Sequence, residues 1–533
     1  MNSDATQRLL DFLSNAGSYP HRPPQVTRVQ THASWVFIAP PFVYKIKKPV
    51  NLGFLDFSTL ELRHADCLRE VALNRRLAED VYLGIEPICE HAGNLHFGGS
   101  GVIVEWAVKM RQMDPRYFLP ELMKTQKVGS GEMDRIVAKL QRFYATQPPL
   151  PPGEVNAATE RLRQCTEDNF KTCASFVGQS LSQCALDAIV HYTRGFFARH
   201  GALLDSRLHD GWIRDCHGDL HLEHIHLSPE SVCIYDCIEF NTDLRCIDVA
   251  CDIAFLAMDL DFNGRPDLAR HIAERFALLL DDHGMKPLMD FYKCYRACVR
   301  GKVESLHAHA ETVEEGEKES SLQLARRYFR LALQYALGGS KPCVFVFMGK
   351  VASGKSALAE ALGRETGWPV LSSDRERKRL AGKPLNHRGS EEERAALYAP
   401  AMTSETYLLL FEQALATLRE GRSVILDATF SKREHRAALQ ERMAAEGCDV
   451  RWIEAHASEA VVRKRLLQRD GDPEVVSDAR LEDWKRLSAG YEPPDELPPE
   501  GRRYILTDGK TGQVFGKLLK GLVDLEPHKN GRF

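Results

Sequence analysis

One eight-residue stretch constrains the fold of this chain more than any other feature. Residues 349–356, GKVASGKS, satisfy the pattern GxxxxGK[ST] in full. The apolar segment CVFVFM precedes the stretch and the amphipathic SALAEALG follows it, which predicts a strand, a tight loop and a helix. In such a loop the backbone N–H groups surround phosphate oxygens, and the helix N-terminus adds positive potential.

The residues of this loop are predicted to divide the work of binding a nucleotide. We expect Lys355 to reach the β- and γ-phosphates, which also makes it a candidate catalytic residue, and Ser356 to bind Mg²⁺. ATP and Mg²⁺ are therefore the expected cofactors. The candidate nucleotide-binding residues of the loop are Gly349, Lys350, Val351, Ala352, Ser353, Gly354, Lys355 and Ser356.

Apolar and amphipathic segments alternate after residue 340, which predicts an α/β domain with a parallel sheet and covering helices. Asp427 ends the apolar segment SVILD, and Asp374 follows the next predicted strand end, PVLSS. Ligands bind at the carboxyl ends of such strands. We expect Asp427 to hold the metal through water and Asp374 to accept a proton from a substrate hydroxyl. The alternative for Asp374 is a helix N-cap.

Arg465 and Arg469 stand four residues apart on a helix predicted to begin near residue 458, so they share one face. They form either a lid over the transferring phosphoryl group or a solvated basic face.

These segments together resemble a known group of enzymes. GKVASGKS, SSDRERKRLAG, LDATF and the arginine-bearing helix are similar to small P-loop kinases, which include gluconate kinase, chloramphenicol phosphotransferase, zeta toxins and the kinase module of polynucleotide kinases. The resemblance covers about residues 341–510. It implies ATP-dependent phosphorylation of a hydroxyl, with Asp374 as the base and Asp427 near the metal.

The chain before residue 340 predicts a small β-rich lobe followed by a large helical lobe. The expected elements are strands at 33–39, 42–47, 85–89 and 102–110, a helix at about 59–79 with a capping box at Ser58 and Glu61, mostly helix from about 134 to 206, and a hairpin after residue 224. A proline-rich loop at 146–154 and an acidic run at 311–321 suggest boundaries. We therefore predict two domains, 1–335 (small lobe about 1–110, large lobe about 111–335) and 341–533.

Two aspartates flank the predicted hairpin: Asp219 in DCHGDLHLEHIHL and Asp236 in VCIYDCIEFN. Phosphoryl transfer needs one aspartate to orient the attacking hydroxyl and another to hold the metal against the nucleotide. Upstream, Lys45 lies in the strand FVYKIK and Glu70 in the capped helix. A strand lysine paired with a helix glutamate is the arrangement that grips the α- and β-phosphates.

These pieces resemble the aminoglycoside phosphotransferase-like branch of the protein-kinase fold, over roughly residues 30–300. The resemblance implies Asp219 as the catalytic aspartate, Asp236 as a metal ligand, Glu70 as the partner of the lysine, and mainly structural roles for Asp248 and Asp252. The lysine is Lys45 or Lys47, which lies two residues away on the same strand face. In tandem, the two modules resemble bacterial proteins that join such a domain to a P-loop kinase.

This chain departs from the family pattern at two places that affect whether the N-terminal site catalyses phosphoryl transfer. His224 stands where the family has a metal-binding asparagine, so we include it in the metal set although neutral imidazole is a poor ligand for Mg²⁺. THASWVF, at 31–37, replaces the glycine-rich loop. The site is therefore expected to transfer phosphoryl, to do so slowly or with another metal, or only to bind nucleotide.

Four histidines gather around this segment, at positions 217, 221, 224 and 226. Because no cysteine or histidine pair has zinc-finger spacing, we favour structural roles over zinc binding.

Charge and composition limit the expected partners. Net charge is −4, from 70 basic and 74 acidic residues, which leaves no electrostatic footprint for duplex nucleic acid. Apolar runs fall short of the ~18 residues of a membrane span, and the first residues do not predict a secretory signal. With 14 scattered cysteines, we expect a cytoplasmic protein with reduced thiols that phosphorylates a small hydroxyl-bearing acceptor.

Two other functions stay open from the sequence. In one, the N-terminal module is a nucleotide-sensing pseudokinase that regulates the P-loop module. In the other, the P-loop module phosphorylates nucleic-acid 5′ ends and loses activity steeply with salt.

Overall fold

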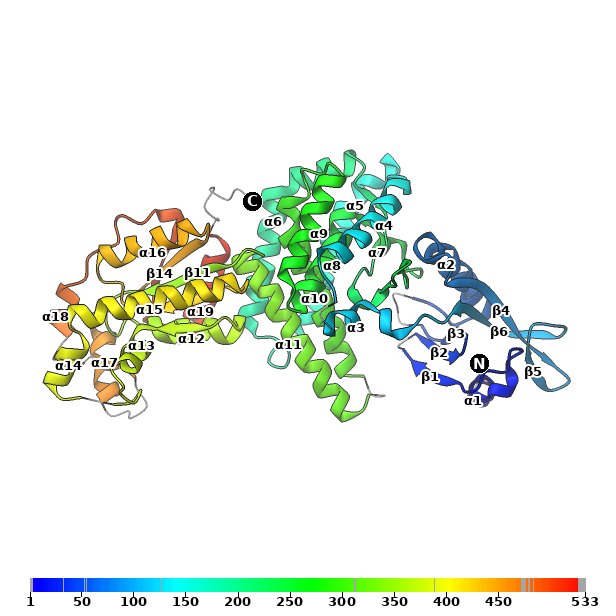
Figure 1. The fold of residues 1–533 in the computed structure, drawn as a ribbon, viewed down its shortest axis with the longest axis horizontal. Coiled ribbons are helices and arrows are strands. Elements are labelled where there is room, and N and C mark those ends of the chain that lie inside the picture. Colours follow the sequence, from blue (N-terminus) through cyan, green and yellow to red (C-terminus); the bar gives the residue numbers. More distant parts are fainter. Residues whose placement is uncertain are drawn as a thin grey trace. The chain divides into compact units, whose positions relative to one another are not determined.

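The chain divides into two compact units, Met1–Gln164 with Ala202–Tyr292, and Cys165–Gly201 with Lys293–Phe533 (Figure 1). The structure is a computed structural model. It describes residues 3–525 except 32, 52, 54, 126, 311–312, 388, 471–475, 478–479 and 483, and the side chains of 3, 152–158 and 470 are not described. Three helices contribute residues to both units: α5 (Pro152–Ala174), α6 (Gln183–His209) and α10 (Met289–Ala308).

An antiparallel sheet of six strands, in the order β1-β2-β3-β6-β4-β5, begins the first unit (blue in Figure 1). Tyr44 and Ile46 of β3 pack in a core with Leu9 and Leu13 of α1 (Ser3–Ser14). Because side chains alternate along a strand, the lysines at 45 and 47 point to the opposite face. The strands are β1 (Thr27–Gln30), β2 (Ser34–Ala39), β3 (Phe42–Lys47), β4 (Tyr82–His91), β5 (Asn94–Phe97) and β6 (Val102–Arg111).

Helix α2 (Leu60–Ala78) packs on β4 and β6, where Cys67 and Val71 join a second small core with Tyr82 and Val108. Its N-cap is Thr59, whose hydroxyl accepts a hydrogen bond from Leu62 N at 3.3 Å. The predicted cap, Ser58, is therefore wrong by one residue. The helix carries Glu70 toward the sheet.

The helical part of the first unit surrounds two short strand pairs. Helix α8 is buried along nearly its whole length. The two pairs are β8 (Ile225–Leu227) with β9 (Val232–Ile234), the predicted hairpin, and β7 (Ile213–Asp215) with β10 (Cys246–Asp248). The remaining helices are α3 (Leu119–Lys124), α4 (Ser130–Thr146), α7 (Thr242–Arg245), α8 (Val249–Phe262) and α9 (Pro266–Leu279), with 3₁₀ turns at Ala16–Ser18, Pro115–Tyr117, Leu222–His224 and Lys286–Leu288.

The second unit contains a five-stranded sheet in which every neighbouring pair is parallel, in the order β12-β13-β11-β14-β15. This confirms the predicted α/β domain with a parallel sheet. Every residue of the central strand β11 is buried, which matches its unbroken apolar sequence. The strands are β11 (Cys343–Met348), β12 (Val370–Ser372), β13 (Val424–Asp427), β14 (Asp449–His456) and β15 (Arg502–Leu506).

Helices cover this sheet. Leu410 of α15 and Leu439 of α16 pack against Val346 and Leu426, while α12 and α19 contact each other and other parts of the sheet. The helices are α11 (Glu315–Gly338), α12 (Lys355–Thr366), α13 (Ser373–Leu380), α14 (Glu391–Leu397), α15 (Pro400–Arg419), α16 (Arg433–Ala445), α17 (Glu459–Asp470), α18 (Trp484–Ala489) and α19 (Thr511–Val523), with a 3₁₀ turn at Pro499–Gly501.

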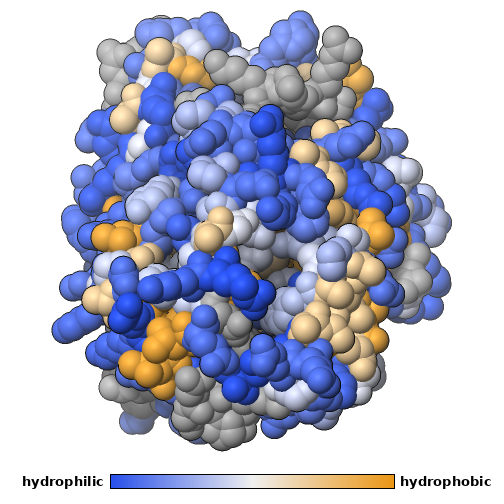
Figure 2. Space-filling view, turned by 90° about the vertical axis from the view of Figure 1, so that its left-hand side faces the viewer, coloured by the Kyte–Doolittle hydropathy of each residue, from blue (hydrophilic) through white to orange (hydrophobic). Residues whose placement is uncertain are grey.

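Helix α11 corrects one predicted boundary. It begins at Glu315, so most of the acidic run at 311–321 is helical, and residues 311–312 lie outside the described residues. In Figure 2 the face that carries α14, α17 and α18 is mostly hydrophilic, with scattered hydrophobic side chains. Across the described part of the chain, none of the helices has the length and apolar character of a membrane span.

Candidate active sites

The loop at 349–356 turns sharply from β11 into α12. Gly349 has a φ of 134°, and a Cβ there would lie 2.4 Å from the carbonyl oxygen of Ala455, which is shorter than any real contact. Gly354, with a φ of 92°, ends the loop directly before Lys355, the first residue of α12. The backbone therefore has the strand, loop and helix order that the motif predicts, and only glycine fits at position 349.

Asp427 lies beside this loop because β13 pairs with β11, with Asp427 opposite Phe347. Its side chain is buried, and its Oδ1 receives no hydrogen bond from the residues that the structure describes. Burial raises the pKa of Asp427, and the charge of Lys355 and a hydrogen bond from Ser356 oppose the rise. A buried carboxylate next to a serine hydroxyl fits Mg²⁺, which prefers oxygen ligands.

Asp374 lies near the same sheet edge. Strand β12 ends at Ser372, which pairs with Asp427, and Asp374 is in the first turn of α13. Its Oδ1 accepts hydrogen bonds from Arg377 Nη1 at 3.1 Å and from the Tyr398 hydroxyl at 3.3 Å. The observed N-cap of α13 is Ser372, so Asp374 is not the cap.

The two predicted arginines of α17 have different surroundings. Arg465 donates from Nη1 to the carbonyl oxygen of Ala352 at 3.1 Å and from Nη2 to the carbonyl oxygen of Thr507 at 2.7 Å, so it braces the loop. Burial lowers the pKa of Arg469, while the charges of Asp374 and Asp427 act to raise it. Arg469 also lines a cavity beside the loop. Residues 471–475, 478–479 and 483, which follow the predicted lid helix, lie outside the described residues.

A cavity of about 290 Å³ opens beside the loop. Polar, apolar and arginine side chains line it, with Gly354 on the side of the phosphate-binding loop. Of its lining, the sequence predicted Gly354, Arg465 and Arg469; Thr507 was missed because the strand β15 that leads into it was not predicted. The lining residues are Gly354, Ala357, Leu358, Arg465, Gln468, Arg469, Thr507, Gly509, Thr511 and Val514.

In the first unit, Lys45 joins the two predicted acidic partners. Its Nζ lies 2.9 Å from Oε1 of Glu70 and 2.7 Å from Oδ1 of Asp236. Asp236 has a φ of 61°, a conformation uncommon outside glycine, and its N–H donates to the Tyr82 hydroxyl at 3.3 Å. Burial acts to raise the pKa of Asp236, but the charge of Lys45 and its hydrogen bond to the carboxylate hold that pKa below its usual value.

Lys47 has a separate environment. Its Nζ lies 2.7 Å from Asp66 Oδ2 and 2.6 Å from Glu70 Oε2, and it also bonds Glu239. Its side chain is 1% exposed, so the ammonium group is enclosed by carboxylates. Burial raises the pKa of Glu239 to about 7 against the charge of Lys47. Of the two lysines that the sequence left open, Lys45 is the one that contacts Asp236.

The segment that carries Asp219 is fixed by carboxylates of α8. Asp252 accepts hydrogen bonds from the backbone N–H groups of His217 at 3.0 Å and Gly218 at 2.9 Å, and Asp259 accepts one from Leu222 at 3.0 Å. The ring of His217 bridges the segment, since Nε2 donates to the carbonyl oxygen of Tyr235 at 2.9 Å. These contacts hold the Asp219 segment next to the hairpin.

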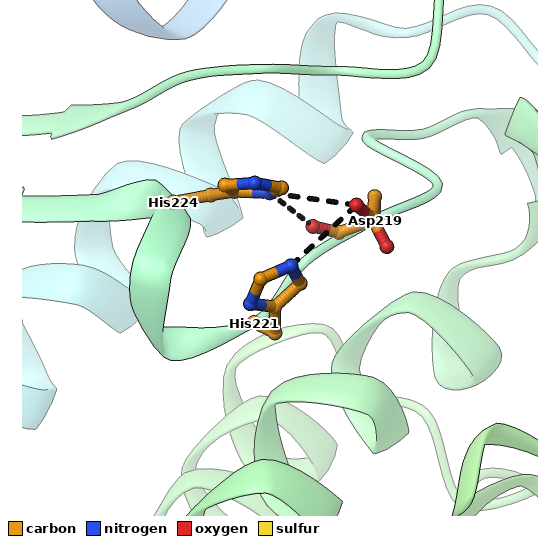
Figure 3. Close-up of side chains that lie close together, drawn as sticks. All are labelled: Asp219, His221 and His224. Atoms are coloured by element: carbon orange, nitrogen blue, oxygen red, sulfur yellow. Dashed lines mark hydrogen bonds and ion pairs between the residues drawn. The ribbon is translucent and has the colours of Figure 1, made fainter. Parts of the chain in front are cut away.

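His224 lies between the two aspartates (Figure 3). Its Nδ1 donates to the carbonyl oxygen of Asp219 at 2.9 Å and lies 3.6 Å from Asp219 Oδ2, while Nε2 lies 3.6 Å from Asp236 Oδ2. Burial and the neighbouring His221 lower the pKa of His224 to about 4. The imidazole is therefore neutral near pH 7, and it occupies the centre of the predicted acidic site.

Comparison with known proteins finds a family model for the P-loop region and relatives for nearly the whole chain. Residues 344–494 match a family model described as an AAA domain. The chain is 30% identical over 495 residues to the uncharacterized protein Rv2004c of Mycobacterium tuberculosis, across 90% of this chain and 94% of that protein, and it is equally similar to the uncharacterized protein Mb2027c of Mycobacterium bovis. The chain belongs to the Rv2004c family. Since the similarity extends over nearly the full length of Rv2004c, the Rv2004c family includes both units.

Several solved structures are similar to about a third of this chain. A gluconokinase from Sinorhizobium meliloti is 21% identical, with 35% of this chain and 94% of that chain covered and a TM-score of 0.25. The APS kinase of Mycobacterium tuberculosis in complex with AMPPNP and APS is 21% identical, with 35% and 97% covered and a TM-score of 0.24.

Proposed function

We propose that this chain is an ATP-dependent bifunctional kinase of the cytoplasm, in which each module transfers a phosphoryl group to the hydroxyl of a small-molecule acceptor. The modules are residues 1–335, with a protein-kinase-like fold of the aminoglycoside phosphotransferase type, and 341–533, a P-loop kinase. The observation that carries the proposal is the buried Asp427 carboxylate beside Ser356 and Lys355, at the mouth of a loop shaped for phosphate.

In the P-loop module the side chains supply the parts that phosphoryl transfer needs. Lys355 neutralises the β- and γ-phosphates, and Ser356 with Asp427 would hold Mg²⁺, which would offset negative charge on the phosphates. Asp374 orients and deprotonates the acceptor hydroxyl. Arg469, which lines the cavity beside the loop, is suited to compensate charge on the transferring phosphoryl group. The cavity lined by Gly354 and Thr507 accommodates the base of the nucleotide.

In the N-terminal module, the support comes from three side chains drawn together from distant parts of the sequence. Lys45 holds Glu70 and Asp236 at ion-pair distance, which is the arrangement that positions phosphates and a metal ion in kinases. Asp219, on the segment braced by Asp252, acts as the catalytic aspartate.

A screen of metabolites with γ-labelled ATP tests the proposal, using wild-type chain, Asp219→Ala and Lys355→Ala. Removing one electrostatic group from a transition state costs about 10²- to 10³-fold, so each variant is expected to lose a different set of labelled products. Asp243→Ala and Lys464→Ala, at exposed positions in each unit, are the matched controls. Labelling that is unchanged in Lys355→Ala would reject the P-loop assignment.

His224 favours a second candidate for the N-terminal module, a nucleotide-sensing regulator. An imidazole replaces the oxygen ligand that Mg²⁺ prefers, which would slow transfer without preventing nucleotide binding. Turnover by the full chain that Lys355→Ala leaves intact and Asp219→Ala abolishes would exclude a pure sensor. Activity that falls steeply with salt would instead indicate a nucleic-acid acceptor for the P-loop module.

A further inference from the structure

The arrangement of Asp219, His221 and His224 matches a metal centre of a kind that Mg²⁺ does not prefer. One potential ligand atom from each of these residues lies within 4.8 Å of the others. His221 Nε2 lies 3.5 Å and His224 Nδ1 lies 3.6 Å from the same oxygen, Oδ2 of Asp219. Figure 3 shows both rings directed at this carboxylate.

The two separations from Asp219 suit a transition metal once Nδ1 of His224 has given up its hydrogen bond to the carbonyl oxygen of Asp219. With bonds of about 2.1 Å and tetrahedral angles, two ligand atoms of a zinc ion lie about 3.4 Å apart. The observed 3.5 and 3.6 Å exceed this by one or two tenths of an ångström. The side chains of His221 and His224 are also well enclosed, with 4% and 13% of their surface exposed.

The far nitrogen of each ring supplies a second, independent argument. Nε2 of His224 lies 3.6 Å from Oδ2 of Asp236, and Nδ1 of His221 lies 3.8 Å from Oε2 of Glu223. Metal-bound histidines usually direct the other ring N–H at a carboxylate or carbonyl oxygen, which orients the ring and strengthens it as a ligand. Both rings thus face Asp219 with one nitrogen and a further carboxylate with the other.

We propose that Asp219, His221 and His224 bind a divalent transition metal of the zinc type. Two imidazoles and one carboxylate are a ligand set typical of catalytic zinc, in which a fourth position stays open for water or substrate. Metal binding moves the proton of His224 from Nδ1 to Nε2, where Asp236 accepts its hydrogen bond. The other oxygen of Asp219 stays available to an acceptor hydroxyl.

Metal binding by these three residues does not depend on the proposed kinase function. Only the role of the metal in phosphoryl transfer rests on that function. The open position would take a phosphate oxygen, which replaces the Mg²⁺ contact that an asparagine would make. Binding of the metal itself needs neither nucleotide nor turnover, so the two ideas can fail separately.

The test measures binding of Zn²⁺ and Co²⁺ to metal-free full-length protein without nucleotide, by calorimetry and by the visible absorption of Co²⁺. Wild type is expected to bind one ion per chain at this site. His221→Gln and His224→Gln are each expected to weaken binding by more than about 100-fold, since loss of a second-sphere partner alone costs about 10- to 100-fold. His271→Gln, which removes a histidine paired with Asp134 at 2.9 Å outside the site, is the matched control and should bind as wild type.

Three further results complete the test. Asp219→Asn, checked for folding by circular dichroism, should also lose Zn²⁺ binding and guards against misfolded histidine variants. His224→Asn should favour Mg²⁺ over Zn²⁺. Equal binding by wild type and all variants, or no binding by wild type, overturns the inference. Binding without any Asp219-dependent transfer keeps the metal site and rejects the N-terminal kinase.

Discussion

Lys45 and Glu70 form an ion pair, with Nζ 2.9 Å from Oε1, that joins strand β3 to helix α2. The other oxygen of Glu70 lies 2.6 Å from Nζ of Lys47. One carboxylate thus binds two lysines from the same face of a strand. Only Lys45 continues to Asp236, so the two lysines have different roles: Lys45 faces the candidate site, and Lys47 neutralises the carboxylates beneath it.

Replacing Lys47 with methionine should destabilise the first unit strongly. The substitution removes the buried cation that Asp66 and Glu239 share and leaves Glu70 with Lys45 alone. Removing one partner of a buried ionic group costs about 3–5 kcal/mol, because the remaining charge is uncompensated. Urea unfolding followed by tryptophan fluorescence would measure the loss. Lys48→Met, one residue away and partly exposed, is the control, and equal stability of the two variants would contradict the prediction.

The sequence predicts the strand, loop and helix around residues 349–356 well because this information is local. Strand, loop and helix follow one another within about 25 residues, and spacing alone indicates which residues meet the phosphates. The observed bounds of β11 and α12 agree with that pattern. The cavity beside the loop was not predicted, since Thr507 lines it from the end of β15, a strand that pairs with β14 and that the sequence did not predict.

The N-terminal site could be predicted only in part, because it depends on contacts between residues that are far apart in the sequence. FVYKIK correctly indicates a strand, but both lysines point to one face, so periodicity cannot separate them. The distinction depends on Asp236, which is 191 positions from Lys45 in the sequence. The histidines pose the same difficulty. The sequence placed His224 in the metal set and gave no reason to add His221, whereas the 3₁₀ turn at Leu222–His224 brings both rings to Asp219.

Acid should weaken the first unit partly through Asp215, which precedes the Asp219 segment. Although burial acts to raise the pKa of Asp215, the hydrogen bond from Arg245 and the charge of Arg76 hold it below its usual value. A carboxyl whose folded-state pKa is depressed stabilises the fold above its unfolded pKa of about 3.9, and this contribution disappears as pH falls through the folded-state pKa.

Asp215→Asn should therefore be less stable than wild type at pH 7, by about 1.5–3 kcal/mol for charged hydrogen bonds, and the difference should shrink below about pH 4. Urea unfolding at a series of pH values measures it. The control is Asp243→Asn, whose exposed carboxyl lies 3.3 Å from Arg161 and should matter by less than about 1 kcal/mol. A constant difference at every pH would count against the assignment.

Gly349→Ala should impair nucleotide binding by the P-loop module. The added Cβ would lie 2.4 Å from the carbonyl oxygen of Ala455, so the loop must shift away from β14. Because the N–H groups must point at phosphate oxygens, we expect affinity for ATP to fall by about 10-fold or more, or about 1.4 kcal/mol. Calorimetry in Asp236→Asn background isolates this site. Gly512→Ala in α19, where nothing lies within 4 Å of the new Cβ, is the control, and equal losses in the two variants would contradict the steric argument.

Asp374→Asn should separate chemistry from nucleotide binding. Its carboxylate accepts hydrogen bonds from Arg377 and Tyr398 at the end of the sheet, and asparagine can keep its shape and accept one of them, but it cannot take a proton from an acceptor hydroxyl. General-base catalysis contributes about 10²- to 10⁴-fold, so kcat should fall by that range while the KM for ATP changes little. Steady-state kinetics with the acceptor found in the labelling screen would measure both constants. The control is Asp449→Asn. Asp449 is the first residue of β14, whereas the candidate site lies where the strands of this parallel sheet end. If Asp374→Asn raises the KM for ATP and leaves kcat unchanged, Asp374 helps to bind the nucleotide rather than to activate the acceptor.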